Sequence, residues 1–210
     1  MAKPAKLSPA PAKAVRTRRA YFDFKFGQLH VRTAFPATGG FDEQVTLFCL
    51  HAERSSSRVF ARFLPEIADV RSVYAPDLPG CGESDPPQTS SVADAANAIC
   101  ELANDLRLRQ IDLLGIQTGA AIALSLTAAR PELVRRLVLI GIPAADRLPQ
   151  VAAPILVMRP RLESSDALAK LKAVMPNARF EDIAHYAGDP FDAEPKTLAK
   201  QIGAFLSGRP

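Results

Sequence analysis

Residues 111–119 read IDLLGIQTG, and this stretch carries the strongest structural signal in the sequence. Its first four residues form a short, mostly apolar run of the kind found in strands that are covered on both faces of a sheet. Two glycines, Gly115 and Gly119, follow the run, and a helical segment then continues to Arg130, where Pro131 stops it. The stretch therefore predicts a buried strand, a turn flanked by glycines and a helix.

Strands and helices alternate in the same way on both sides of this stretch. Short apolar runs that predict strands occur at residues 45–50, 70–74, 137–140, 155–158 and 178–183. Apolar residues at helical spacing predict helices at residues 60–67, 91–106, 165–174 and 198–206. Ser91 and Asp94 resemble a capping box at the start of the second of these helices. The alternation predicts an α/β fold with a doubly wound, mostly parallel sheet.

An antiparallel hairpin is predicted at the start of the ordered domain. Residues 21–26 alternate in character, Gly27 and Gln28 supply a turn, and residues 29–32 run back. Before this hairpin, the chain holds six basic side chains and no acidic one: Lys3, Lys6, Lys13, Arg16, Arg18 and Arg19. A segment so rich in Pro, Ala and Lys cannot bury a core. We therefore predict a disordered tail at residues 1–19 and one domain at residues 20–208.

The basic tail is open to more than one interpretation. Three interpretations are open: a solubilising segment without a partner, an arm that binds nucleic acid or a membrane surface, and an import sequence. Pro4, Pro9 and Pro11 would break an amphipathic targeting helix. Beyond this tail, the sequence carries no strong signal for nucleic-acid or membrane binding.

The overall composition fits one soluble globular domain. Of the 210 residues, 48% are hydrophobic and 23% are charged, and no apolar run reaches the roughly eighteen residues of a membrane span. The three cysteines, Cys49, Cys81 and Cys100, lack the spacing of metal ligands, and no secretory signal precedes them. We therefore expect reduced thiols, a cytoplasmic location, and neither a metal nor a cofactor.

Four stretches together resemble the α/β-hydrolase fold superfamily, and the resemblance runs from about residue 21 to residue 206. His51 and Ala52 follow the first buried strand, where relatives carry His-Gly. Residues 77–85, DLPGCGESD, are similar to the family's turn after the next strand, and residues 131–139 to a helix-to-strand link. Residues 115–119, GIQTG, take the place of the nucleophile elbow Gly-x-Ser-x-Gly. Any one of these motifs alone is weak evidence for the family. All four occur in the same order as in the family, and this makes the resemblance specific.

The resemblance implies a degenerate catalytic triad. The elbow is a strained turn that needs tiny residues two positions before and after its tip, and this predicts positive φ at Gln117. An amide at the tip cannot form an acyl-enzyme, and Thr118 is a displaced alternative. The position of the acid falls on Glu163 and that of the histidine on Gly188, with His185 three residues earlier.

Other positions follow from the same resemblance. Backbone N–H groups near Ala52, Glu53 and Thr118 would form the oxyanion hole. His51 and Asp77 are interpreted as structural residues that bond loop backbone. No lid domain is expected, because only residues 141–153 join two strands between which relatives insert a helical cap.

Three functions remain open at this point. The first is a non-catalytic protein that binds a small carbonyl-containing ligand or a protein partner at Ala52, Glu53, Gln117 and Thr118. The second is a hydrolase that acts on a small carbonyl or ester substrate through non-standard residues, with Thr118, Glu53, Cys81 and His185 as candidates. The third is a passive scaffold that its basic tail tethers to a partner.

Overall fold

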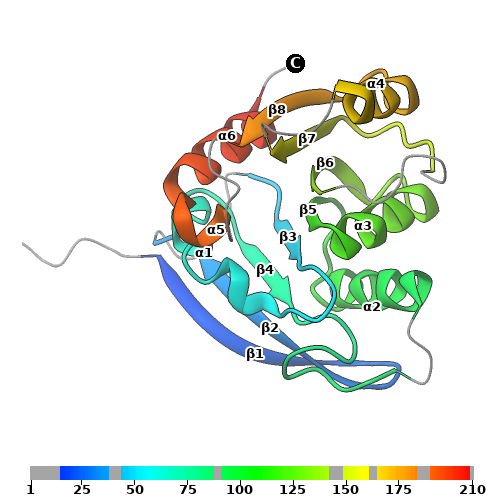
Figure 1. Ribbon diagram of the computed structural model, residues 1–210. Helices are drawn as coiled ribbons and strands as arrows, with labels where there is room; N and C mark the ends of the chain where they lie inside the picture. The colour runs from blue at the N-terminus through cyan, green and yellow to red at the C-terminus, as the bar shows by residue number, and fades with distance from the viewer. Residues whose placement is uncertain are drawn as a thin grey trace, which may run out of the picture.

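A single mixed sheet organises the computed structural model, which describes residues 15–37, 44–87, 91–141, 149–160, 165–183 and 190–208. Across these residues the order of the eight strands is β1-β2-β4-β3-β5-β6-β7-β8 (Figure 1). The strands are β1 Arg16–Phe24, β2 Gly27–Phe35, β3 Leu47–Leu50, β4 Val73–Pro76, β5 Ile111–Ile116, β6 Val134–Ile140, β7 Ile155–Pro160 and β8 Arg179–Ile183. The helices are η1 Ser57–Phe60, α1 Leu64–Ile67, α2 Val92–Asp105, α3 Thr118–Ala129, α4 Ser165–Val174, α5 Pro190–Ala193 and α6 Pro195–Ser207.

The strand directions confirm the predicted fold class. β1 and β2 form an antiparallel pair, and β2 also lies antiparallel to β4. From β4 through β3 and β5 to β8 the neighbouring strands are parallel. The chain leaves β3 toward β4 on one side and then places β5 on the other side, so a topological switch point lies at the carboxyl end of β3. Crevices at such points bind ligands in open α/β sheets.

Two apolar layers explain why the strand sequences are continuous apolar runs. Successive strand residues point to opposite faces, so Leu113 packs in one cluster and Leu114 in the other. The first cluster includes buried residues of α2 and α3, such as Ile99 and Leu124. The second includes buried residues of α1, α5 and α6, such as Ile202. Figure 1 shows α2 and α3 on one side of the sheet and α1, α5 and α6 on the other.

A buried charge cluster joins the amino-terminal ends of the central strands to α6. Asp112 is fully buried and accepts hydrogen bonds from Arg71 Nη1 at 3.1 Å and from Arg135 Nε at 3.0 Å. Arg136 Nη1 donates to the carbonyl oxygens of Phe205 and Leu206, each at 2.7 Å. Buried charges are tolerated when they are paired, and arginine hydrogen bonds satisfy carbonyls that a helix end leaves free. The cluster therefore fixes the end of α6 against the sheet.

The predicted start of the domain is wrong by four residues. β1 begins at Arg16, which pairs with Phe35, and the register continues without a break to Phe24 opposite Gly27. The charge of Arg16, Arg18 and Arg19 favours a tail, yet an edge strand can hold such side chains in solvent. Residues 1–14 lie outside the described part of the chain, and the disorder of the tail stays a prediction there.

Two helical segments also differ from the prediction. The segment at residues 60–67 is not one helix but the 3-10 turn η1 followed by the single turn α1, which carries Pro65 near its start. Its predicted apolar face is nevertheless buried, at Phe60, Phe63, Leu64 and Ile67. The sequence did not indicate α5, which buries Phe191 against Phe60 and Phe63 with ring centroids 5.0 Å apart in each pair.

Candidate functional site

The elbow between β5 and α3 has the strained geometry that the sequence predicts. Gln117 has φ 49° and ψ −108°, which confirms the predicted positive φ, and its side chain is exposed. The turn is held by the Gln117 N–H, which donates to the carbonyl of Ile140 at 2.8 Å. At Gly115 a Cβ atom would lie 2.5 Å from the carbonyl oxygen of Gly119, so only glycine fits there. Such strain costs about 1–3 kcal/mol and persists where the surroundings enforce it.

Asp77 anchors the loop that follows β4, as its interpretation as a structural turn residue predicts. Its Oδ1 accepts a hydrogen bond from the Ser57 N–H at 2.6 Å, and its Oδ2 accepts one from the Glu83 N–H at 2.9 Å. His30 Nδ1 also lies 2.9 Å from Oδ2. Burial raises the pKa of Asp77, but these hydrogen bonds outweigh it and hold the pKa below its ordinary value.

His51 is a structural residue as well, which confirms its interpretation from the sequence. Its Nε2 accepts the Leu78 N–H at 2.9 Å, so Nδ1 carries the proton and donates to the Ala52 carbonyl at 2.7 Å. Burial lowers the pKa of His51 and favours this neutral tautomer. Because both ring nitrogens are engaged and the side chain is buried, His51 is not available as a general base.

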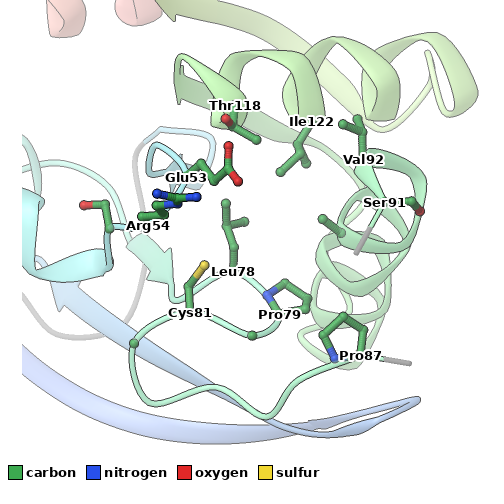
Figure 2. A pocket seen from close by; sticks show the side chains of 14 residues that line it. Glu53, Arg54, Leu78, Pro79, Cys81, Pro87, Ser91, Val92, Thr118 and Ile122 are labelled. Carbon is green, nitrogen blue, oxygen red and sulfur yellow. The ribbon is translucent and has the colours of Figure 1, made fainter. Parts of the chain in front are cut away.

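A cavity of about 570 Å³ opens beside the elbow, at the carboxyl end of β3 and β5. Figure 2 shows side chains from four segments around it: the loop after β3, the loop after β4, and the first turns of α2 and α3. Its lining consists of Glu53, Arg54, Ser55, Leu78, Pro79, Gly80, Cys81, Gly82, Pro87, Ser91, Val92, Ala95, Thr118 and Ile122. Glu53, Arg54 and Thr118 lie at one end of the cavity, while Leu78 and Ile122 give an apolar wall (Figure 2).

The structure brings only some of the predicted site residues to this cavity. Glu53 and Thr118 line it, whereas the half-buried Ala52 and the exposed Gln117 do not. As the first residue of α3, Thr118 has a backbone N–H that the helix itself leaves without a carbonyl partner. Glu163, His185 and Gly188 lie outside the described residues, as does most of the segment at 141–153 on which the expected lack of a lid depends.

Cys81 lines the cavity but is not an activated nucleophile. Burial raises the pKa of its thiol, a hydrogen bond from the Arg54 backbone lowers it, and the charges of Asp77 and Glu53 raise it further. The net pKa is above the ordinary value, so the group stays a thiol near neutral pH. Within the described ranges, no three His, Cys, Asp or Glu side chains gather closely enough to hold a metal ion.

Sequence reasoning missed several cavity residues. Arg54 has φ 57°, and this unusual backbone places it next to Glu53 at the polar end of the cavity. The sequence predicts Val92 only as a residue of an apolar helix face and Ile122 only as part of the helix after the elbow, yet both line the cavity. The capping box at Ser91 could have pointed to this region, because it fixes the start of α2 beside the loop after β4. Ser91 Oγ accepts the Asp94 N–H at 3.0 Å, which confirms the cap.

Comparison with known proteins places the chain in a family. A family model described as "alpha/beta hydrolase fold" matches residues 45–186, and the chain belongs to this family. Residues of the chain are 40% identical over 83 positions to 2-hydroxymuconate semialdehyde hydrolase from Pseudomonas sp. (strain CF600), covering 37% of this chain and 28% of that enzyme. A haloalkane dehalogenase from Bradyrhizobium diazoefficiens is 32% identical over 105 residues, covering 50% of this chain and 34% of the dehalogenase.

Solved structures show the same fold at low sequence identity. Naproxen esterase from Bacillus subtilis superposes with a TM-score of 0.76 and 17% identity, over 91% of this chain and 92% of the esterase. The thioesterase domain of the curacin biosynthetic pathway gives a TM-score of 0.75 with 14% identity, over 92% of this chain and all of the domain. The chain spans only about a third of the curated relatives named above, 28% and 34% of their lengths.

Proposed function

We propose that this protein is a non-catalytic member of the α/β-hydrolase fold family that binds a small carbonyl-containing ligand in the cavity of about 570 Å³. The observation that carries the proposal is Gln117 at the tip of a retained elbow. The backbone geometry of the nucleophile position is present, but an amide cannot attack a carbonyl carbon. The absence of a catalytic histidine at Gly188 stays a prediction from the sequence.

Two features of the cavity support a carbonyl-containing ligand. The Thr118 N–H at the start of α3 is a hydrogen-bond donor at the positive end of the helix dipole. Leu78, Val92 and Ile122 give a wall for an apolar body. Glu53 and Arg54 lie at the same end with opposite charges, so we propose an uncharged ester, ketone or amide. A protein is the alternative kind of partner that we propose for this cavity. Separately, none of the helices in the described ranges is long and apolar enough to cross a membrane.

A second candidate is a hydrolase that uses a non-standard nucleophile. Thr118 favours it, because its side chain lines the cavity beside the elbow, and one of the curated relatives is named a hydrolase. The raised pKa of Cys81 disfavours the other nucleophile in the cavity. This candidate needs a general base close to Thr118, and His51 does not supply one because both its nitrogens are bonded.

Covalent labelling separates the two candidates. The full chain is incubated with a fluorophosphonate probe and, separately, with an activated ester such as p-nitrophenyl acetate. The proposal expects no labelling and no burst of product. Stoichiometric labelling that disappears in Thr118→Ala would overturn the proposal in favour of the hydrolase.

Ligand binding is tested on a blocked cavity. In ¹⁵N-labelled protein, the Thr118 amide signal should shift as methyl butyrate is added. Val92→Trp should abolish the shift by filling the cavity, whereas Val70→Trp should not, since Val70 is similarly exposed, at 37% against 39%, but lies elsewhere. A response that is equal in both variants would contradict binding in this cavity.

A further inference from the structure

A second cavity, of about 320 Å³, lies against the β1–β2 hairpin and has no lining residue in common with the cavity beside the elbow. Its lining consists of Thr17, Arg18, Arg19, Arg32, Thr33, Ala61, Leu64 and Pro65. The strands supply three arginines and two threonines, and the start of α1 with the residues before it supplies the apolar wall. No acidic residue is among these lining residues.

The register of the hairpin places two of the arginines directly opposite each other. Arg19 pairs with Arg32 across β1 and β2, and Arg18 pairs with Thr33. Residues that face each other in an antiparallel pair have Cβ atoms about 4.5–5.5 Å apart, and like charges in such a pair destabilise the sheet. The hairpin therefore holds two arginine residues opposite each other, at a cost.

The described residues offer little compensation for this charge. Arg32 Nε is buried and has no hydrogen-bond partner in the described part of the chain. Arg19 Nη1 lies 3.9 Å from Glu83 Oε1, but both side chains are at least half exposed, and such pairs contribute little. A buried donor that lacks a partner is costly. An anion in the cavity would satisfy it.

Neighbouring side chains add to the positive potential. A third cavity, of about 530 Å³, shares Ala61 with the hairpin cavity and is lined in part by Arg54, Arg58 and Arg62. Of these three, Arg62 is paired, with Asp192 Oδ1 at 2.9 Å. Asp192 also lines this third cavity, so Arg54 and Arg58 account for its excess of positive charge. Clefts with such an excess raise the local concentration of counter-ions.

We propose that the hairpin cavity is a binding site for the phosphate group of a phosphate monoester. Guanidinium groups match phosphate with paired N–H donors, and two or three of them suit a dianion better than a single carboxylate charge. The hydroxyl group of Thr17 is a further donor, because alternating strand residues place Thr17 on the same face of the hairpin as Arg19 and Arg32. At about 320 Å³ the cavity has room for a phosphate and part of the group that carries it.

The test uses inorganic phosphate and the full chain. Phosphate is titrated at constant ionic strength while the melting temperature is followed. The melting temperature should rise and saturate, as expected for a ligand that binds only the folded state. Arg32→Gln should weaken the apparent affinity by about tenfold or more, and Arg32→Lys should recover only part of it. Arg109→Gln removes the same charge from an exposed site outside the cavity and should bind like the wild type.

The melting temperature without phosphate checks the folding of the variant. Arg32→Gln should melt at or above the wild type, because it removes the like-charge pair and the unpartnered donor. A second arm measures co-sedimentation with phosphatidylcholine vesicles that contain or lack phosphatidic acid. A response to free phosphate indicates a soluble phosphate ester, and a response confined to phosphatidic acid indicates a lipid head group. Either response supports the site if Arg32→Gln weakens it by about tenfold or more. The proposal is overturned if neither arm responds, if Arg32→Gln responds like the wild type, or if acetate stabilises as strongly as phosphate.

Discussion

A Cβ atom at Gly119 would lie 2.2 Å from the carbonyl oxygen of Leu50, the last residue of β3. The first turn of α3 thus packs directly on the backbone at the carboxyl end of the neighbouring strand. This contact brings the Thr118 N–H close to the loop that carries Glu53, and so shapes the polar end of the cavity. Glycine is needed at position 119 because α3 approaches the backbone of β3 so closely, and not because the position has an unusual φ.

The contact predicts a large loss of stability in Gly119→Ala. The methyl group would collide with backbone, which cannot move aside as a flexible side chain can, so we expect a loss of at least about 3 kcal/mol in the free energy of unfolding. Urea unfolding followed by circular dichroism measures it. Gly203→Ala in α6 is the control, because its Cβ would meet only Ile67 Cδ1 at 3.4 Å and alanine favours a helix. Equal stability of the two variants would contradict this packing.

Stability should also fall in two steps as the pH is lowered. The folded-state pKa of His51 is depressed, so the unfolded chain binds the proton more readily, and stability decreases as pH falls below about 6.5. The folded-state pKa of Asp77 is also depressed, so its contribution is present above about pH 4 and is lost as pH falls through the folded value.

Matched variants assign these two steps. Unfolding free energies are measured from pH 8 to about pH 3 for wild type, His51→Gln and Asp77→Asn. His51→Gln should be less stable at neutral pH, by about 1–3 kcal/mol, but should lose the upper step. Asp77→Asn should lose the lower step, and it too should be destabilised, since one of its oxygens becomes a donor facing other donors. If both variants keep the wild-type pH profile, these groups do not govern it.

Much of the fold was predictable because it follows from local chemistry. The period of the apolar residues indicated a parallel sheet, and Leu113 and Leu114 show why the runs are continuous: one packs on each face. The glycines around Gln117 indicate a strained turn from the sequence alone. His51 and Asp77 were correctly interpreted as structural, since each follows a strand and meets loop backbone.

What escaped prediction depends on contacts between distant parts of the chain. Arg71 and Arg135 read as ordinary charged residues, and only the sheet brings both to Asp112. Likewise, the charge of Arg19 suggested a tail, whereas the register opposite Arg32 places it in a strand. Such pairings depend on strand register and order, which the sequence pattern alone does not determine.

The corrected start of β1 gives a prediction for two truncated chains. Residues 16–19 pair with residues 32–35, so a chain that begins at Ala20 loses these partners, whereas one that begins at Val15 keeps them. The longer chain should melt close to the full chain. The shorter one should melt lower, by about 2–4 °C for each kcal/mol lost. Thermal melts of the three chains measure the difference, and equal melting of the two truncated chains would show that this part of β1 contributes nothing.

The last prediction tests whether the family's chemistry can be restored to this frame. Gln117→Ser together with Gly188→His supplies a nucleophile at the elbow tip and a base at the position that the family resemblance indicates, where Glu163 would orient the histidine. The elbow retains φ 49°, and the Thr118 N–H remains at the start of α3 as an oxyanion donor. The double variant should therefore hydrolyse p-nitrophenyl acetate measurably above the wild type, since a placed nucleophile and base contribute several orders of magnitude. Each single variant should be far less active, because the two residues act as a unit. Gln117→Ala with Gly188→His is the control for a histidine that acts alone. If the double variant folds, as its melt and circular dichroism will show, yet stays inactive, then the elbow does not face a usable oxyanion site, and the proposal of a carbonyl-binding cavity falls with it.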